Sequence, residues 1–363
     1  MNSWTKMTIY TILIILTAIS FLTSVFAETL VLDSRKGIDT NPGTALMPIK
    51  TFKEAAKRIN NSIESGPTVI KVAPGIHILD ETVLFYNDRA YTEHDRLIIE
   101  AEILPDDPRW KPELMPIILS IGLPQEWRKS DEPIDYTGFK IEINHVTIRG
   151  LKFLGNPIPE IWYYPIFREG KDLNDLVVTQ CLFTMDSYAV TSNVCILANG
   201  HGLVVDHCIF YNCRNPVVFW RAESGTSHGN TMRHCIVDGA YTSAVWVCDT
   251  GEDFEFHHNI ITHSRYAWIR DEDNKRTYRL HDCIITENEY NSGQCGANWK
   301  LDPTGPDITF EEENVTKSGK VIMETIDGID ADIPTRYLHV VPDSLGSGLD
   351  AGLFKKITKE NHP

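Results

Sequence analysis

One motif returns along the middle of this chain, and it limits the possible folds more than any other feature. Six segments align without gaps: VTIRGLKF (146–153), LVVTQCLF (176–183), LVVDHCIF (203–210), NTMRHCIV (230–237), FEFHHNII (254–261) and YRLHDCII (278–285). Their equivalent positions are Leu151, Cys181, Cys208, Cys235, Asn259 and Cys283. Self-similarity at a short, nearly constant period of this kind is typical of solenoid proteins.

The repeated segments have the character of short β-strands. They are rich in β-branched residues and alternate in polarity, instead of placing apolar residues at helical spacing. The pattern of leucine-rich repeats is missing. Each repeat fits one strand such as LVVD, a tight bend at HC, a second strand such as IFYN, a variable loop and a third strand such as PVVFW. The sequence therefore predicts an all-β solenoid, a right-handed parallel β-helix with coils about 4.8 Å apart.

The recurring cysteine would stack on itself in neighbouring coils. A structural ladder of small buried side chains is expected at Cys181, Cys208 and Cys235. Disulfides are an alternative in an oxidising compartment, with Cys208–Cys213 or Cys283–Cys295 as possible pairs.

The ends of a β-helix expose strand edges that need covering. Thr51 to Glu54 form a capping box that opens an amphipathic helix over 51–63, which we expect to be the N-terminal cap. Residues 68–145 would form the first, longer coils. Residues 299–363 leave the repeat, and we expect them to cover the far end. Residues 28–363 are thus expected to form a single β-helix domain.

The start of the chain has the pattern of a secretory signal over residues 1–27. Lys6 precedes a long apolar run, and Val25-Phe26-Ala27 offers small side chains for cleavage. An uncleaved membrane anchor is the alternative, because the run is long enough to span a bilayer. Cleavage predicts a secreted, periplasmic or extracellular monomer without stable membrane insertion.

The formal net charge of −16 excludes most nucleic-acid partners, because phosphate binding needs a basic face. An anionic sugar is still compatible with this charge, since a local basic cleft can lie on an acidic body.

Three stretches of the chain resemble a known group. VLDSRKGIDTNPGTALMPIKTFKEAAKRI followed by IKVAPGIHILDETVLF resembles the opening of secreted β-helix proteins of the pectate-lyase-like superfamily. LIIEAE with MPIILSIGLPQEW resembles a segment of β-helix glycoside hydrolases, and YLHVVPDSLGSGLDAG resembles the closing segment of such proteins. The resemblance implies the β-helix fold, but the superfamily holds lyases, hydrolases, epimerases and non-catalytic adhesins. The glycine-rich motif of the group reads Ser120-Ile121-Gly122 here, and the lyase Arg/Lys signature is missing.

The third strands of successive coils suggest a binding face. Because strand side chains alternate between faces, one column is expected to point inward at Trp220, Val247 and Ile269. The opposite face would carry the residues expected to hold a carbohydrate chain, namely Phe219, Trp246, Trp268, Arg168, Arg221 and Arg270. Flat aromatic rings suit the apolar faces of sugars, with polar neighbours reading the hydroxyl groups. The alternative is that loops fold over this face and make the aromatic rings a second small core.

Carboxylates follow these strands. Asp249 and Asp271 are expected at matching positions in adjacent coils, about 5 Å apart, with Glu272 and Glu223 close by. Retaining glycosidases place their two carboxyl groups about 5–5.5 Å apart and inverting enzymes about 6.5–9.5 Å apart. This spacing favours a glycoside hydrolase with Asp249 and either Asp271 or Glu272 as the catalytic pair. Alternatively, these aspartates cap turns.

Two other functions remain open on the same face. In a polysaccharide lyase that acts on uronates, Arg221 and Arg270 would clamp the substrate, and Ca²⁺ would bind Asp249, Asp271 and Asp273. His228 would then be an acid or base, or only an exposed loop residue. The third hypothesis is a non-catalytic glycan-binding β-helix.

No cofactor or metal is predicted apart from Ca²⁺ under the lyase hypothesis. His257, His258 and His263 lack metal-ligand spacing along the chain. Bend positions are expected at His207, His234 and Asp282.

Overall fold

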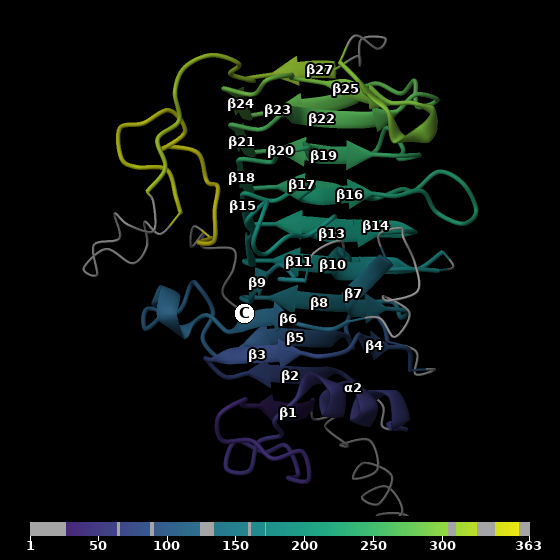
Figure 1. The fold of residues 1–363 in the computed structure, drawn as a ribbon, viewed down its shortest axis with the longest axis vertical. Helices are drawn as coiled ribbons and strands as arrows, with labels where there is room; N and C mark the ends of the chain where they lie inside the picture. The colour runs from purple at the N-terminus through teal and green to yellow at the C-terminus, as the bar shows by residue number, and fades with distance from the viewer. Residues whose placement is uncertain are drawn as a thin grey trace, which may run out of the picture.

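The computed structural model describes residues 27–63, 66–87, 91–123, 134–158, 161–170, 172–303, 310–324 and 338–355. Its strands form three long sheets that run along the molecule (Figure 1). Named strands pair in parallel in the described residues, except for the antiparallel pair β25–β26. This is the predicted right-handed parallel β-helix.

Sheet A contains β1 (Glu28–Leu32), β2 (Thr68–Val72), β5 (Leu97–Ala101), β8 (Val146–Arg149), β11 (Asn174–Thr179), β14 (His201–Asp206), β17 (Thr231–Arg233), β20 (Glu255–His257), β23 (Tyr278–His281) and β27 (Phe310–Glu313). Sheet B contains β3 (Ile76–Leu79), β6 (Ile117–Ser120), β9 (Lys152–Leu154), β12 (Leu182–Thr184), β15 (Ile209–Tyr211), β18 (Ile236–Asp238), β21 (Ile260–Thr262) and β24 (Ile284–Thr286). Sheet C contains β4 (Val83–Phe85), β7 (Ile134–Ile141), β10 (Ile161–Arg168), β13 (Ile196–Ala198), β16 (Val217–Phe219), β19 (Ser243–Val247), β22 (Tyr266–Asp271), β25 (Gly293–Cys295) and β26 (Leu301–Asp302).

The register of sheets A and B is the one that the repeat predicts. Leu176 pairs with Val146 and with Leu203, which hold the same position in the preceding and following repeats. Thr231 likewise pairs with Glu255, its counterpart in the next repeat. Each coil therefore passes from a sheet A strand through a bend into sheet B and then through a loop into sheet C.

The bend between sheets A and B uses a left-handed backbone conformation in each repeated coil. Positive φ angles between 50° and 54° occur at Gln180, His207, His234, His258 and Asp282. Asparagine, aspartate and histidine tolerate this conformation better than other side chains that carry a Cβ atom. The prediction of bend residues at His207, His234 and Asp282 is confirmed.

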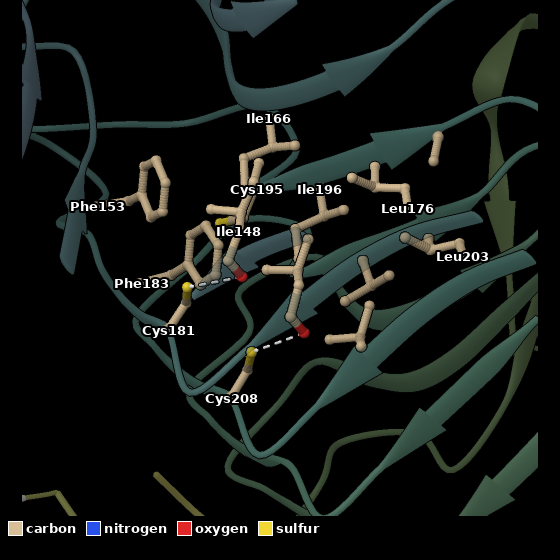
Figure 2. Close-up of a cluster of buried hydrophobic side chains, with 14 of the residues drawn as sticks. Ile148, Phe153, Ile166, Leu176, Cys181, Phe183, Cys195, Ile196, Leu203 and Cys208 are labelled. Carbon is tan, nitrogen blue, oxygen red and sulfur yellow. Dashed lines mark hydrogen bonds between the residues drawn. The ribbon is translucent and has the colours of Figure 1, made fainter. Parts of the chain in front are cut away.

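The core between the sheets contains the predicted cysteine ladder (Figure 2). The thiols of Cys181 and Cys208 donate to the carbonyl oxygens of Ile148 and Val178 at 3.7 and 3.5 Å. All eight cysteines are buried with free thiols, so neither alternative disulfide is formed. A parallel ladder of stacked rings lies beside them, with centroid distances of 4.9 and 4.8 Å between neighbours, at Phe153, Phe183 and Phe210.

The predicted N-terminal helix is α2 (Phe52–Asn61), which lies at the β1 end of the column (Figure 1). Thr51 is its N-cap, and the Thr51 hydroxyl accepts a hydrogen bond from the Glu54 amide at 3.2 Å. The reciprocal half of the capping box is absent, because the Thr51 amide donates to Asp39 and Glu54 pairs with Arg58 instead. The buried face of the helix joins the main core through Phe52, Ala55, Ala56 and Ile59.

Part of the segment after the repeat lies along the side of the β-helix and not at its far end. β27 extends sheet A beyond β23, whereas residues 338–355 lie along the outer face of sheet B (Figure 1). Leu338 and Leu353 pack there on a column of apolar side chains that includes Leu182, Ile209 and Ile236. The short 3-10 turn η1 (Pro112–Leu114) flanks Trp110, whose ring contacts Phe354 at a centroid distance of 5.2 Å.

Residues 1–26, which hold nearly all of the expected secretory signal, lie outside the described residues. Within the part of the chain that is described, the helices are too short or too polar to cross a bilayer.

Candidate functional site

The third strands are one residue out of the predicted register. Trp246 pairs with Val218 and Ile269, whereas Trp268 pairs with Val245. Trp246 and Trp268 are therefore not vertical neighbours, and the predicted ladder is wrong. The residue that pairs with Trp246 in the next coil is Ile269, and Trp268 precedes Ile269 by one residue. Since strand side chains alternate, a slip of one residue moves a side chain to the opposite face.

Several residues predicted to face the substrate are buried inside the β-helix. Phe219 and Trp268 are each 1% exposed and belong to the main core. Arg168 and Arg270 continue the inner column of Phe219 and Val247, and they are 0% and 2% exposed. The prediction that these four residues point outward is wrong. Val247 points inward as predicted.

The two buried arginines bind the backbone around them. Arg168 Nε donates to the Asn199 carbonyl oxygen at 2.6 Å, and burial lowers the pKa of Arg168 to about 9. Arg270 Nη1 donates to the carbonyl oxygen of Asn274 at 2.6 Å. Both guanidinium groups therefore fasten the loops that connect sheet C to sheet A.

The outer surface of sheet C carries a different set of aromatic side chains, which we call the tryptophan face: Trp220, Trp246 and Trp299. The Trp299 ring lies 6.0 Å from the ring of Trp220 and 6.3 Å from that of Trp246, centroid to centroid. Trp299 is 66% exposed, and Trp220 is half-buried. Trp220 and Ile269, predicted to point inward, both belong to this outer cluster.

The sequence pattern did not identify Trp299 as a surface aromatic residue, because Trp299 lies beyond the repeat. It ends the 3-10 turn η3 (Ala297–Trp299), where Asn298 and Trp299 have positive φ angles. This turn follows β25, the sheet C strand of the next coil, and so returns the chain to the tryptophan face. The guanidinium of Arg221, exposed as predicted, lies 5.9 Å from the Trp220 ring centroid.

Asp271 lies at the end of β22 beside this face. Its Oδ1 accepts a hydrogen bond from the indole N–H of Trp246 at 3.3 Å. Burial raises the pKa of Asp271, and the charge of Asp273 raises it further. Hydrogen bonds from Trp246 and Cys248, with the charge of Arg221, act in the opposite direction and offset only part of the shift. Asp271 is thus a carboxyl group that keeps its proton to a higher pH than an ordinary aspartate.

Asp249 does not hold the position equivalent to Asp271. Val247 pairs with Arg270, so Cys248 is the residue that precedes Asp271 by one coil. Asp249 Oδ1 instead accepts hydrogen bonds from Thr226 Oγ1 at 3.0 Å and from Arg276 Nη1 at 2.6 Å. The predicted alignment is therefore wrong, and the Asp249 carboxylate joins the 220–230 loop to the loop after β22.

The remaining predicted catalytic residues are exposed. Glu272 follows Asp271, and its amide donates to the Cys295 carbonyl oxygen at 3.0 Å. Glu223 lies on the loop between β16 and β17. His228 Nδ1 lies 3.1 Å from Asp253 Oδ1, on the side of the molecule formed by sheet A. Their catalytic roles stay predictions.

His228 borders a polar pocket on the outside of sheet A. The cavity measures about 400 Å³ and is lined by Glu93, Arg96, His145, Asn174, Asp175, Gly202, Val204, His228 and Gly229. His145 Nδ1 lies 2.7 Å from Asp175 Oδ2, and Arg96 also binds this carboxylate. Although burial alone would raise it, the hydrogen bonds from Arg96 and His145 lower the pKa of Asp175. Asp175 is therefore an ionised partner that orients the His145 ring.

The aspartates proposed as Ca²⁺ ligands do not converge in the described residues. Groups of three side chains whose ligand atoms come within 4.8 Å of one another occur instead at the bend between sheets A and B, and each consists of three histidines or of two histidines and one aspartate. Spacing along the chain did not reveal these groups, because their members come from different coils.

Comparison with known proteins supports the assignment of the fold. No protein-family profile matches the chain, and no curated protein does. A solved structure of a rhamnogalacturonan lyase aligns with a TM-score of 0.51 and 11% identity, covering 73% of this chain and 70% of the other. The selenomethionine derivative of a GH136 lacto-N-biosidase from Eubacterium ramulus aligns with a TM-score of 0.50 and 10% identity, covering 80% of this chain and 67% of the other. The chain shares the right-handed parallel β-helix fold with both.

Proposed function

We propose that this protein is a secreted carbohydrate-active enzyme that hydrolyses a glycosidic bond at the tryptophan face, with Asp271 as the general acid. The observation that carries the proposal is a partly buried carboxyl group, held by the indole N–H of Trp246, on a face that also carries the exposed ring of Trp299. A raised pKa lets such a group hold its proton to a higher pH than an ordinary aspartate, and the protonated form is the one that donates a proton to the leaving oxygen.

The substrate would lie against Trp299 and Trp220. The exposed ring of Trp299 and the accessible part of the half-buried Trp220 ring offer flat apolar surfaces that match the C–H faces of pyranose rings, and Arg221 adds hydrogen-bond donors at the edge. The outer column of sheet C below these rings is apolar and would exclude water from one side of the sugar.

A second carboxylate is needed to activate water or to attack the anomeric carbon. Glu272 and Asp273 are exposed next to Asp271, and the charge of Asp273 already acts on it. We therefore assign this role to one of these two residues. Asp249 is better suited to hold the loops, because Arg276 and Thr226 occupy its carboxylate.

The comparisons support the proposed class, a carbohydrate-active enzyme, but they do not identify the reaction that it catalyses. One similar fold carries the name of a lyase and the other that of a lacto-N-biosidase, so a poly- or oligosaccharide substrate fits both. Export belongs to the proposal because residues 1–27 have the pattern of a secretory signal.

A panel of poly- and oligosaccharides tests the proposal. We expect new reducing ends without the ultraviolet absorbance of an unsaturated sugar, and a loss of roughly 10²–10⁴-fold in rate for Asp271→Asn. Asp186→Asn is the matched control, because Asp186 is an exposed turn residue on another loop. An active Asp271→Asn enzyme with unchanged rate would refute the assignment.

The polar pocket favours a second candidate, a lyase acting on a uronate. His145, oriented by Asp175, has a ring nitrogen available as a base, and His228 lies on the same pocket. In that case the panel yields unsaturated products, and His145→Gln, rather than Asp271→Asn, abolishes them. Binding without any product would leave the glycan-binding hypothesis.

A further inference from the structure

Five histidines gather at the bend between sheets A and B. His207, His234 and His258 occupy the bend position of three successive coils, with ring centroids 4.5 and 4.8 Å apart. One residue earlier in their coils, the rings of His257 and His281 stack at 4.7 Å. Because each coil repeats the position of the last, residues a whole coil apart in sequence become direct neighbours.

The nitrogen atoms of these rings converge. Ligand atoms of His234, His257 and His258 all lie within 4.8 Å of one another. Two further groups share members with the first and include a carboxylate, namely His207 with His234 and Asp350, and His258 with His281 and Asp282. We propose that this cluster binds a divalent transition-metal ion such as Zn²⁺, with His234, His257 and His258 as the ligands.

The chemistry of the donors selects the ion. Three imidazole nitrogens form the ligand set of many zinc sites, with bonds of about 2.0–2.1 Å and a fourth position left for water or a carboxylate. Tetrahedral bonds of that length place the nitrogens about 3.3 Å apart, so small rotations of the half-buried rings would close the present spacing. Ca²⁺ and Mg²⁺ prefer oxygen ligands and do not fit this set.

The surroundings of the rings support metal binding over a purely structural stack. The Nδ1 atom of His234 contacts the Asp350 carbonyl oxygen, which can only accept, so Nδ1 carries the proton and Nε2 keeps a lone pair. The Nδ1 atoms of His257 and His258 lie 3.0 Å apart, which is close to the spacing of two ligands on one tetrahedral ion. The Nε2 atom of His207, a residue only 6% exposed, has no hydrogen-bond partner among the described residues.

The C-terminal segment would be fixed by the same ion. The Gly352 amide donates to the His234 carbonyl oxygen at 2.9 Å, and an Asp350 carboxylate oxygen lies 4.0 Å from His207 Nε2. A metal held by the bend would therefore also hold residues 338–355 against sheet B. This role is independent of the proposed chemistry at Asp271.

The test uses the full mature protein without a histidine tag, stripped by a chelator and titrated with Zn²⁺ alone. We expect one equivalent to bind with micromolar or tighter affinity and to raise the thermal midpoint. Removing a residue that only orients a metal ligand lowers metal affinity by roughly 10–100-fold. In the His257→Gln/His258→Gln variant, which loses two ligands, we expect the affinity for Zn²⁺ to fall by more than this.

His263→Gln is the matched control. His263 is also a histidine with positive φ paired to a carboxylate, but it lies at the bend between sheets B and C. Its substitution should leave Zn²⁺ binding unchanged. If the double variant unfolds, His234→Gln and the visible spectrum of bound Co²⁺, which reports tetrahedral nitrogen ligands, provide the second measurement. Wild-type protein that takes up no Zn²⁺, or folded ligand variants that bind Zn²⁺ as tightly as wild type, would overturn the proposal.

Discussion

Trp268 offers a sharp test of the register of sheet C. Its side chain is 1% exposed and packs in the core against Phe256 and Phe310, at centroid distances of 5.0 and 5.4 Å. A buried tryptophan removes about 200 Å² from water, which at about 25 cal/mol per Å² contributes about 5 kcal/mol. Alanine keeps a small part of this, so we expect Trp268→Ala to reduce the free energy of unfolding by about 4 kcal/mol.

Trp268→Phe separates burial from hydrogen bonding. The indole N–H of Trp268 is buried and has no acceptor among the described residues, an arrangement that costs about 1–3 kcal/mol. Phenylalanine loses part of the buried area but also removes this donor. The two effects oppose each other, so the free energy of unfolding should change by no more than about 1 kcal/mol.

Chemical denaturation of purified variants, followed by both circular dichroism and tryptophan fluorescence, measures these differences. Trp299→Ala is the matched control, because the 66% exposed ring should contribute less than about 0.5 kcal/mol to stability. A Trp268→Ala variant as stable as wild type would place Trp268 on the outside and refute the register described above.

Three further predictions concern the face and the cap. Trp299→Ala should raise KM for the glycan several-fold with little change in kcat, as measured by steady-state kinetics, if its ring only holds the sugar. Trp246→Phe removes a hydrogen bond that lowers the pKa of Asp271, so that pKa should rise; because the acid acts when protonated, the alkaline limb of the pH–rate profile should move to higher pH. Thr51→Ala should reduce the free energy of unfolding by about 1 kcal/mol through loss of the N-cap, as measured by denaturation, and an unchanged midpoint would contradict the capping role.

The sequence predicted sheets A and B better than sheet C for a physical reason. One tight bend of constant length joins the strands of sheets A and B, so a gapless repeat carries the register, and the column at Cys181, Cys208 and Cys235 is found as predicted. Loops of different lengths precede the strands of sheet C. There, Trp246 was matched to Trp268 by identity instead of to its true partner Ile269, and this error exchanged the two faces of β22.

The expectation that charged side chains lie on the surface also led to a wrong prediction for two arginines. Arg168 and Arg270 lie in the inner column because each finds a backbone carbonyl at the end of its strand. Sequence reasoning missed Trp299 and the histidine cluster for a different reason. Neither is visible as a motif along the chain, since packing between coils brings their parts together.

The role of Asp271 can be tested most directly by changing the leaving group of the substrate. A general acid matters for a sugar leaving group, which must be protonated, and matters little for an aryl leaving group that departs as a stable anion. Once the panel identifies the glycan, we expect Asp271→Asn to lose about 100-fold or more in kcat/KM on it, but to keep most of its activity on the activated aryl glycoside of the same sugar. Equal losses on both substrates would contradict the assignment of Asp271 as the proton donor.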